Sequence, residues 1–319
     1  MTGPIYIENP PPFRHAPRGP EQALVKLPID EGAEIVQQYL NSGLSIAGFH
    51  HADLDRYEAL QLRHEIPPER YTAFEYAEAL RQRLNGFQGV LIPHHLVVYE
   101  PPQQQATCFE HLLQKGISNV VLVGRPFSTP PDGVIYQATV EETLRYLRER
   151  FGDRLHLGVI GIHTRRGEAA RIADKFEAAD GRLRVMGQFL DDAAPMVSFM
   201  DQLMREFERR RLSLDGLEWN VGLAIFSLGS RAFYAKLLRQ ERLACEDRFK
   251  DLTAIEARIA VSLDLNLQFA DAISTRARTL GLRLGYSIQP IIERYLDGRL
   301  HPAVQGAILL AQRLGTSEY

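Results

Sequence analysis

The chain has 319 residues, of which 45% are hydrophobic and 24% charged, as is typical of a soluble globular protein. Its formal net charge of -3 argues against a nucleic-acid-binding protein, and no apolar run reaches the roughly 18 residues of a membrane span. The two cysteines, Cys108 and Cys245, form no CxxC pair, and the first residues lack a secretory signal pattern. A cytoplasmic protein that needs no disulfides is therefore expected.

Eight short apolar runs, each bounded by Gly, Pro or polar residues, predict buried parallel strands. In chain order they are Ile5–Glu8, Leu44–Phe49, Gly89–His95, Asn119–Gly124, His156–Ile162, Leu183–Gln188, Trp219–Ile225 and Arg283–Ile288. Helical patterns separate many of them, at Gln103–Lys115, Val140–Phe151, Glu168–Ala178 and Pro195–Arg210. This alternation predicts an α/β fold, a single (β/α)8 TIM barrel over residues 1–319. The first strand is not followed by GxGxxG, which argues against a Rossmann domain.

Three long βα loops are expected, at Asn9–Pro20, His50–Arg70 and Ser128–Gly133. In such a barrel the active site lies at the carboxyl ends of the strands. The polar residues expected there are Glu8, His50, His51, His94, His95, Arg125, His163, Arg165, Arg166, Gln188, Ser227, Tyr286 and Gln289, together with Gly124. Their convergence from several strands predicts a catalytic rim.

Glu8 ends the first strand and is followed by Asn9-Pro10-Pro11-Pro12, which cannot continue a hydrogen-bonded ladder. A partly buried carboxylic acid at this position can have a raised pKa and donate a proton near neutral pH. The competing interpretation is an exposed acid that only ends the strand. His94 and His95 are adjacent, so only one of them can point into the barrel.

These residues resemble the methylenetetrahydrofolate reductase family. The shared pattern is a first strand ending in Glu with Pro-Pro after two residues, a third strand ending in Pro-His-Leu, a helical Lys, and a strand ending in Gln-Phe. Here these are Glu8 with Pro11-Pro12, Pro93-His94-His95-Leu96, Lys175 and Gln188-Phe189, and the similarity runs from Ile5 to about Phe226. The resemblance implies a folate-dependent oxidoreductase that reduces 5,10-methylenetetrahydrofolate to 5-methyltetrahydrofolate with NAD(P)H.

The resemblance also implies roles for particular residues. Glu8 would be the general acid, and Gln188 would pair with the pterin, since an amide offers both a donor and an acceptor. The other substrate-binding residues expected are Phe189, Phe226 and Tyr286. The cofactor-binding residues expected are His94, Gly124, Arg125, His163, Arg166 and Lys175, with no metal. The expected partner is a small-molecule folate, with a homo-oligomer left open.

Flavin-binding members of the family have an Asp after the fourth strand and a Tyr-Pro after the fifth. This chain has Gly124-Arg125-Pro126 and Ile162-His163-Thr164-Arg165-Arg166-Gly167 at those places. Three explanations stay open: FAD held differently, with Arg165 or Arg166 on its phosphates; direct hydride transfer from a nicotinamide; or loss of the folate reaction. Two rival classes are a metal-dependent lyase or hydrolase using His50, His51 and His94, and a non-catalytic folate-binding relative.

Overall fold

The computed structural model describes residues 3–8, 29–52, 71–84, 87–125, 136–226, 243–250, 252–291 and 302–316. Its eight parallel strands close into a barrel in chain order, with β1 hydrogen-bonded to both β2 and β8. They are β1 (Ile5–Glu8), β2 (Gly48–His51), β3 (Val90–Leu96), β4 (Asn119–Val123), β5 (His156–Gly161), β6 (Leu183–Phe189), β7 (Leu217–Phe226) and β8 (Arg283–Ile291). The predicted (β/α)8 barrel is confirmed.

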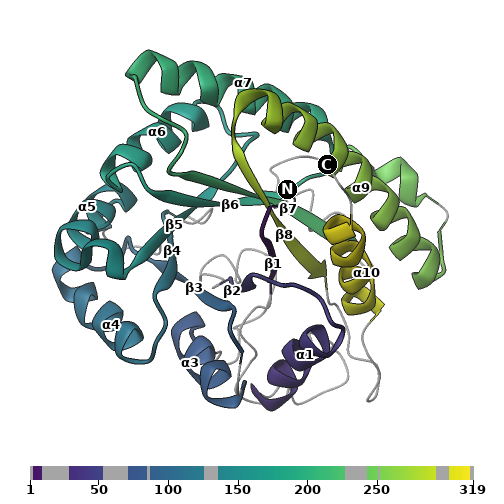
Figure 1. Cartoon of the computed structure of the whole chain (residues 1–319), viewed down its shortest axis with the longest axis horizontal. Coiled ribbons are helices and arrows are strands. Elements are labelled where there is room, and N and C mark those ends of the chain that lie inside the picture. Colours follow the sequence, from purple (N-terminus) through teal and green to yellow (C-terminus); the bar gives the residue numbers. More distant parts are fainter. Residues whose placement is uncertain are drawn as a thin grey trace.

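Helices form a ring around the barrel (Figure 1). They are α1 (Ile29–Asn41), α3 (Ala73–Arg83), α4 (Pro102–Gln114), α5 (Val140–Phe151), α6 (Glu168–Ala178), α7 (Ala193–Arg210), α9 (Ile255–Leu280) and α10 (Pro302–Thr316), with short 3-10 turns at Gly152–Arg154 and Glu246–Phe249. Two of them begin with a capping box, Thr72 with Glu75 and Thr139 with Glu142, in which each side chain accepts from the other residue's backbone N–H. These caps define where α3 and α5 begin.

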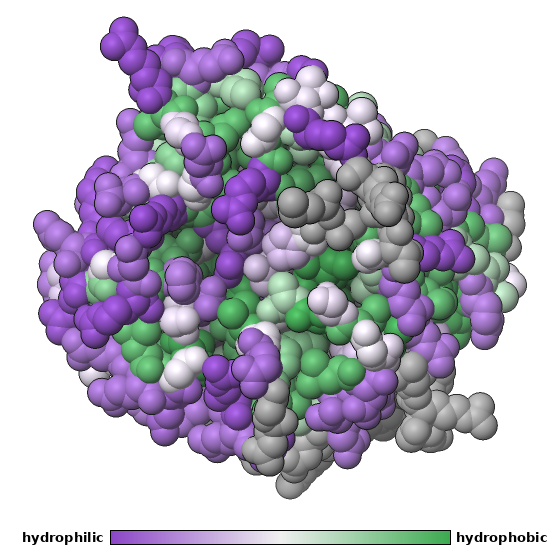
Figure 2. All heavy atoms as spheres, in the orientation of Figure 1, coloured by the Kyte–Doolittle hydropathy of each residue, from purple (hydrophilic) through white to green (hydrophobic). Residues whose placement is uncertain are grey.

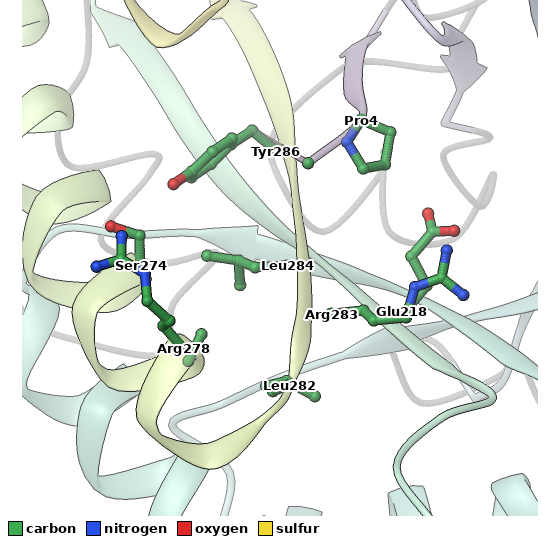
Figure 3. Close-up of a pocket in the computed structure, with 10 residues that line it drawn as sticks. Pro4, Glu218, Ser274, Arg278, Leu282, Arg283, Leu284 and Tyr286 are labelled. Carbon is green, nitrogen blue, oxygen red and sulfur yellow. The ribbon is translucent and has the colours of Figure 1, made fainter. Parts of the chain in front are cut away.

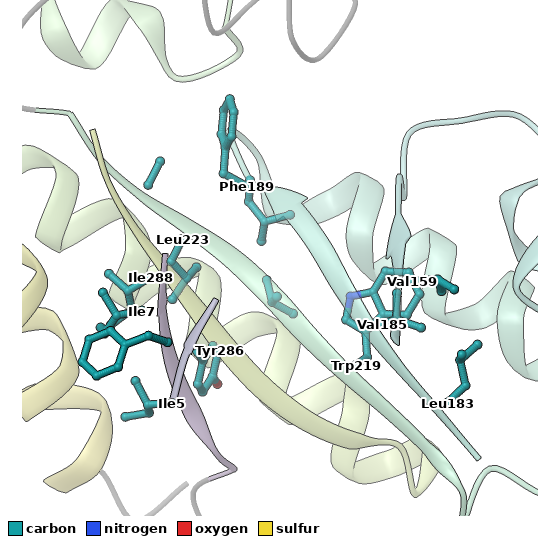
Figure 4. Packing of buried hydrophobic residues seen from close by; sticks show 14 of the residues in the cluster. Ile5, Ile7, Val159, Leu183, Val185, Phe189, Trp219, Leu223, Tyr286 and Ile288 are labelled. Carbon is teal, nitrogen blue, oxygen red and sulfur yellow. The ribbon is translucent and has the colours of Figure 1, made fainter. Parts of the chain in front are cut away.

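The strands have two faces because successive side chains alternate across the barrel wall. One set packs outward under the helices and forms the large core, which includes Ile5, Ile7, Val185 and Trp219 (Figure 4). The other set forms a separate small cluster of Tyr6, Ile92, Val121 and Met186. This second cluster fills the barrel interior below the carboxyl ends of the strands.

The second strand differs from its predicted position. Residues 44–47 precede the strand, and β2 instead includes His50 and His51. Pairing with its neighbours sets this register: Glu8 of β1 lies opposite His50, and Ile92 of β3 also lies opposite His50. Two histidines can be buried in a strand here because each finds a polar or aromatic partner.

A polar layer lies at the amino end of the barrel. The Glu218 Oε1 atom accepts from Arg184 Nε at 3.0 Å, from Asn220 Nδ2 at 2.8 Å and from the Tyr6 hydroxyl at 3.3 Å. Arg184 also donates to Asn119 Oδ1 at 2.8 Å and lies over the Tyr6 ring. These bonds join β1, β4, β6 and β7, so this layer ties strands together on the side of the barrel remote from the predicted rim.

On the face seen in Figure 2, hydrophilic residues dominate the periphery and hydrophobic residues are visible nearer the centre. No helix in the described part of the chain is long and apolar enough to cross a membrane. The predicted loops at Asn9–Pro20 and Ser128–Gly133 lie outside the described residues, as does all of His50–Arg70 beyond Ala52.

Candidate functional site

Glu8 is the last residue of β1, and alternation with the outward-facing Ile7 turns its side chain toward the barrel axis. The side chain is 25% exposed, so the carboxyl group lies at the rim of the barrel with protein around most of it. Burial raises the pKa of Glu8 to about 7, because a carboxylate removed from water is disfavoured. Near neutral pH this group can therefore hold a proton and release it.

A chain of hydrogen-bonding side chains crosses the barrel interior beside Glu8. The His50 Nε2 atom lies 2.6 Å from Ser287 Oγ on β8, and His50 Nδ1 lies 3.3 Å from His94 Nε2 on β3. The two imidazole rings are stacked, with centroids 5.3 Å apart and planes inclined by 12°. The His50 Nε2 atom is also 3.9 Å from Glu8 Oε2. Burial and the neighbouring imidazole hold the pKa of His50 well below its usual range, so the ring is uncharged.

The neighbouring histidines of both strands face the other way. His51 packs edge-on against Tyr76 of α3, with ring centroids 5.0 Å apart. His95 stacks on Phe74 and meets the edge of Phe109, at 4.8 Å and 5.4 Å. Of the adjacent pair in β3, His94 is therefore the residue inside the barrel. Because His51 lies outside, the three histidines of the metal hypothesis do not converge.

Among the described residues, no cluster of three or more His, Cys, Asp or Glu side chains could hold a metal ion.

A cavity of about 410 Å³ opens at the carboxyl ends of β3 to β6 and the start of α5. Its size falls within the roughly 300–1,000 Å³ of small-molecule sites. The apolar part of its lining includes Leu96, Val98, Leu122, Ile160 and Ile162. The polar part includes Gly124, Arg125, Glu141, Arg165, Arg171, Lys175 and Gln188. Five predicted residues, Gly124, Arg125, Arg165, Lys175 and Gln188, are thus brought together.

Among the described residues of this lining, cationic side chains outnumber acidic ones, with three arginines and a lysine against Glu141. Lys175 is only 9% exposed, and burial lowers the pKa of its ammonium group. Guanidinium and ammonium groups are the side chains that bind phosphate and carboxylate oxygens. The cavity therefore suits the anionic end of a ligand.

The turn after β5 positions Arg165 at the cationic cavity. Glu168, whose side chain is fully buried, accepts from the Ile162 N–H at 3.0 Å and lies 3.4 Å from Arg165 Nη1. Through these contacts the carboxylate ties the end of β5 to the first turn of α6. Arg165 consequently lies at the cavity rather than extending into solvent, whereas its neighbour Arg166 is exposed and does not line the cavity.

Gln188 lies next to last in β6 and lines the same cavity. Its Oε1 atom is buried and has no hydrogen-bond partner in the described part of the chain. A buried amide oxygen without a partner is costly, and a donor on a bound ligand would satisfy it. This oxygen is a candidate recognition point for a heterocycle.

Four other predicted residues lie elsewhere. His163 is buried in the turn after β5, with its pKa lowered to about 4 by burial, but does not line the cavity. Phe189 and Phe226 contact each other at the ends of β6 and β7, with ring centroids 6.0 Å apart, and Phe226 also packs on Phe249. Both phenylalanines belong to the large outer core. The fourth residue is Tyr286 of β8.

Tyr286 occupies the middle of β8, with its ring on the outward side toward α9 (Figure 3). It lines a second cavity of about 520 Å³ with Pro4, Arg278 and Leu284, near the amino end of the barrel. Glu218 of the polar layer lies on the other side of β8 in this view. The structure thus does not bring Tyr286 to the rim that carries Glu8.

Several residues of the site were not singled out by sequence reasoning, among them Ser287 and Arg171. Ser287 bonds to His50 inside the barrel, and Arg171 lines the cationic cavity. Strand alternation contained a signal for the first, since Ser287 lies two residues before Gln289 and shares its face. Arg171 precedes Lys175 by four residues in α6, the i, i+4 spacing that places two helical side chains next to each other.

No protein-family profile matches the sequence, and no curated protein matches it. Solved structures do match. One is a protein from Clostridium thermocellum that binds two copies of 5-methyl-5,6,7,8-tetrahydrofolic acid; it has 17% identity and a TM-score of 0.65, over 98% of this chain and 95% of that one.

Two further matches are oxidoreductases. The long-chain alkane monooxygenase LadA has 10% identity and a TM-score of 0.55, over 99% of this chain and 91% of that one. An F420-dependent secondary alcohol dehydrogenase, solved with an F420-acetone adduct, has 10% identity and a TM-score of 0.59, over 98% of both chains. At these identities the matches establish the fold alone, a (β/α)8 barrel.

Proposed function

We propose that the chain is a folate-dependent oxidoreductase resembling methylenetetrahydrofolate reductase. It would reduce 5,10-methylenetetrahydrofolate to 5-methyltetrahydrofolate with NAD(P)H. The observation that carries the proposal is the Glu8 carboxyl group at the barrel rim, whose pKa burial raises to about 7. Opening the five-membered ring of the substrate requires a proton on the departing nitrogen, and Glu8 would supply it.

The residues of the cavity support the proposal in two ways. Gln188 has an amide oxygen without a hydrogen-bond partner among the described residues, and this oxygen can accept from the edge of a pterin, which carries both donors and acceptors. Arg125, Arg165, Arg171 and Lys175 would hold the phosphates of a nucleotide. The methyltetrahydrofolic acid bound by the Clostridium thermocellum protein is consistent with a reduced folate in a barrel of this fold.

The cationic cavity fits the diphosphate of either a nicotinamide or a flavin nucleotide, because both carry the same anionic group. Such a cofactor would supply the hydride, and the chain's own groups would orient it and protonate the product nitrogen. The family's flavin-contacting Asp is missing from Gly124-Arg125-Pro126, and Arg125 lies over the Tyr136 ring at 4.7 Å. We therefore favour hydride transfer directly from the nicotinamide.

An absorption spectrum of the purified protein, followed by an NAD(P)H oxidation assay, tests this proposal. We expect colourless protein that oxidises NAD(P)H only when methylenetetrahydrofolate is present. Flavin absorbance with the same activity would select the FAD-dependent form. Absence of folate-dependent oxidation with either nicotinamide would overturn the proposal.

A second candidate is a non-catalytic folate-binding protein. It is favoured by the replacement of family flavin positions and by a structural match whose known property is folate binding. Calorimetric binding of 5-methyltetrahydrofolate without turnover by any nicotinamide would identify this form.

A further inference from the structure

We propose that the cationic cavity is specific for a phosphomonoester, so that the nicotinamide nucleotide of this protein is NADPH and its 2′-phosphate lies between Arg171 and Lys175. The inference rests on the function proposed above, which leaves the choice between NADH and NADPH open. The two nucleotides differ only in this phosphate. It carries about 1.5 to 2 negative charges at pH 7, because the second pKa of a phosphomonoester is about 6.

Arg171 and Lys175, the α6 pair, are cations one helical turn apart without a partner. Both line the cavity, and neither side chain has a hydrogen bond or an ion pair within the described part of the chain. Like charges at the i, i+4 spacing repel each other. Lys175 is also only 9% exposed, and a mostly buried ammonium group favours a negatively charged partner. A concentrated negative charge between the two groups would therefore stabilise both.

The other two cations of the lining already have partners. Arg165 Nη1 lies 3.4 Å from Glu168 Oε2, and the Arg125 guanidinium lies 4.7 Å from the centre of the Tyr136 ring. Both can still donate to a diphosphate, in which each phosphate carries a single charge. The positive charge without a partner is concentrated on the α6 pair, and the phosphate that matches it best is a dianion.

The cavity does not provide the backbone cradle by which dinucleotide-binding folds usually hold a diphosphate, a glycine-rich turn at the start of a helix. Helix α5 begins at the cavity, but two of its N–H groups are used in its capping box. The Thr139 N–H donates to Glu142 Oε2 at 2.8 Å, and the Glu142 N–H donates to Thr139 Oγ1 at 3.2 Å. Gly124 is the single glycine among the described lining residues. Recognition therefore depends on side-chain cations, which bind a dianion more strongly than a singly charged phosphate.

Glu141 is the one acid in the described lining, and it favours the opposite choice. A carboxylate can accept from the 2′-hydroxyl of NADH, as acidic residues do in NAD-binding folds. Glu141 is only partly buried, however, so its carboxylate can turn toward solvent. The more deeply buried ammonium of Lys175 has less access to water, so we expect its preference to decide which nucleotide binds.

Calorimetric titration of the folate-free protein with NADPH and with NADH tests the inference. We expect NADPH to bind about 10- to 100-fold more tightly, the effect of one or two hydrogen bonds to a charged group. Arg171→Gln should remove most of this preference by weakening NADPH binding, with little change for NADH. Lys175→Met should have the same effect. Arg171 is exposed, so its replacement tests the site without disturbing the core.

A control variant and a pH series make the result specific. Arg145→Gln replaces an exposed arginine of α5 that does not line this cavity, and it should keep the preference. For NADP⁺ and NAD⁺, which withstand acid, the ratio of the two dissociation constants should fall between about pH 7.5 and 5.5, because the 2′-phosphate takes up a proton there. The diphosphate has no ionisation in this range, so a constant ratio would contradict recognition of a phosphomonoester.

Three other outcomes would overturn the inference. They are equal affinities for NADPH and NADH, a preference for NADH that Glu141→Gln removes, and a preference for NADPH that survives in both Arg171→Gln and Lys175→Met. The titrations need no folate, so the two proposals fail separately. A preference for NADPH without folate turnover removes only the proposed reaction. Folate turnover that uses both nucleotides equally removes only the phosphomonoester site.

Discussion

The Oε2 atom of Glu8 and the Nε2 atom of His50 lie 3.9 Å apart on adjacent strands, and the two groups have opposite responses to burial. Burial raises the pKa of the carboxyl to about 7 and lowers that of the imidazole. Near neutral pH the imidazole is consequently uncharged and the carboxyl is partly protonated.

Replacing Glu8 by Gln should lower kcat for folate reduction by about 10²- to 10⁴-fold, the usual range for loss of a general acid. Nucleotide binding should change little, because Glu8 does not line the cationic cavity. Glu149 is an exposed acid on α5, and steady-state kinetics of Glu149→Gln provide the control. Full activity in Glu8→Gln would remove Glu8 from the proposed reaction.

Glu8 should also make the folded protein less stable as the pH rises. Its folded pKa of about 7 exceeds the usual 4.5, so the folded state binds more protons between these values. This contribution to stability is complete below pH 4.5 and is lost as the pH rises through 7, on the order of 3 kcal/mol in all. Urea unfolding should therefore show Glu8→Gln to be the more stable protein at pH 8. Parallel pH curves for the two proteins would contradict the raised pKa.

Buried histidines should destabilise the fold in acid. Burial lowers the pKa of His95 to about 4, and that of His163 to about 4, from the usual 6.5. The unfolded chain binds these protons first, so the stability is present above pH 6.5 and is lost as the pH falls through 4. His95→Phe should reduce the acid loss by on the order of 2–3 kcal/mol, measured by urea unfolding at pH 4 and 7. An undiminished acid loss would show that His95 does not contribute.

Lys175→Met should weaken nucleotide binding by about 10- to 100-fold, because a buried ammonium in a cationic cavity would be removed. Calorimetric titration with NADPH at two salt concentrations should also show a weaker salt dependence. Arg209→Gln is the control, because this exposed arginine of α7 pairs with Glu206 away from the cavity. Equal losses in both variants would argue against a specific anion site.

Glu218→Ala should cost about 2 kcal/mol of stability without affecting chemistry at the rim. The change leaves Arg184 without its carboxylate partner and removes the acceptor of Asn220 and Tyr6. Urea unfolding and kinetics would be measured together, with Glu218→Gln, which retains an acceptor oxygen, expected to lose less. A large loss of kcat in a stable Glu218→Ala protein would contradict a purely structural layer.

Much of the barrel could be predicted because its signals are local. β1, α5 and α6 begin and end at the predicted residues, because prolines follow β1 and the apolar residues of both helices have helical periodicity. The inward position of a single histidine in β3 follows from alternation alone. The predicted position of β2 was wrong because hydrogen bonding to β1 and β3 sets the register of this strand. The residues of the strand itself give no indication of those contacts.

The site was less predictable for two reasons. Tyr286 was expected at a strand end, but β8 continues to Ile291 through Pro290, so this tyrosine lies mid-strand on the outer face. The choice between Arg165 and Arg166 depends on the turn that Glu168 stabilises, a contact invisible to strand or helix patterns. Long-range pairs, such as His50 with Ser287, need the closed barrel before they can be recognised.

The apolar layer of Tyr6, Ile92, Val121 and Met186 determines the side from which a ligand can enter the barrel. Because these side chains fill the barrel beneath the rim, a ligand reaches Glu8 from the carboxyl end of the strands. A nucleotide in the cationic cavity and a folate above Glu8 would share this entrance. In the proposed reaction, whichever of the two molecules covers the other must arrive last and depart first, so product-inhibition patterns should reveal a compulsory order of binding.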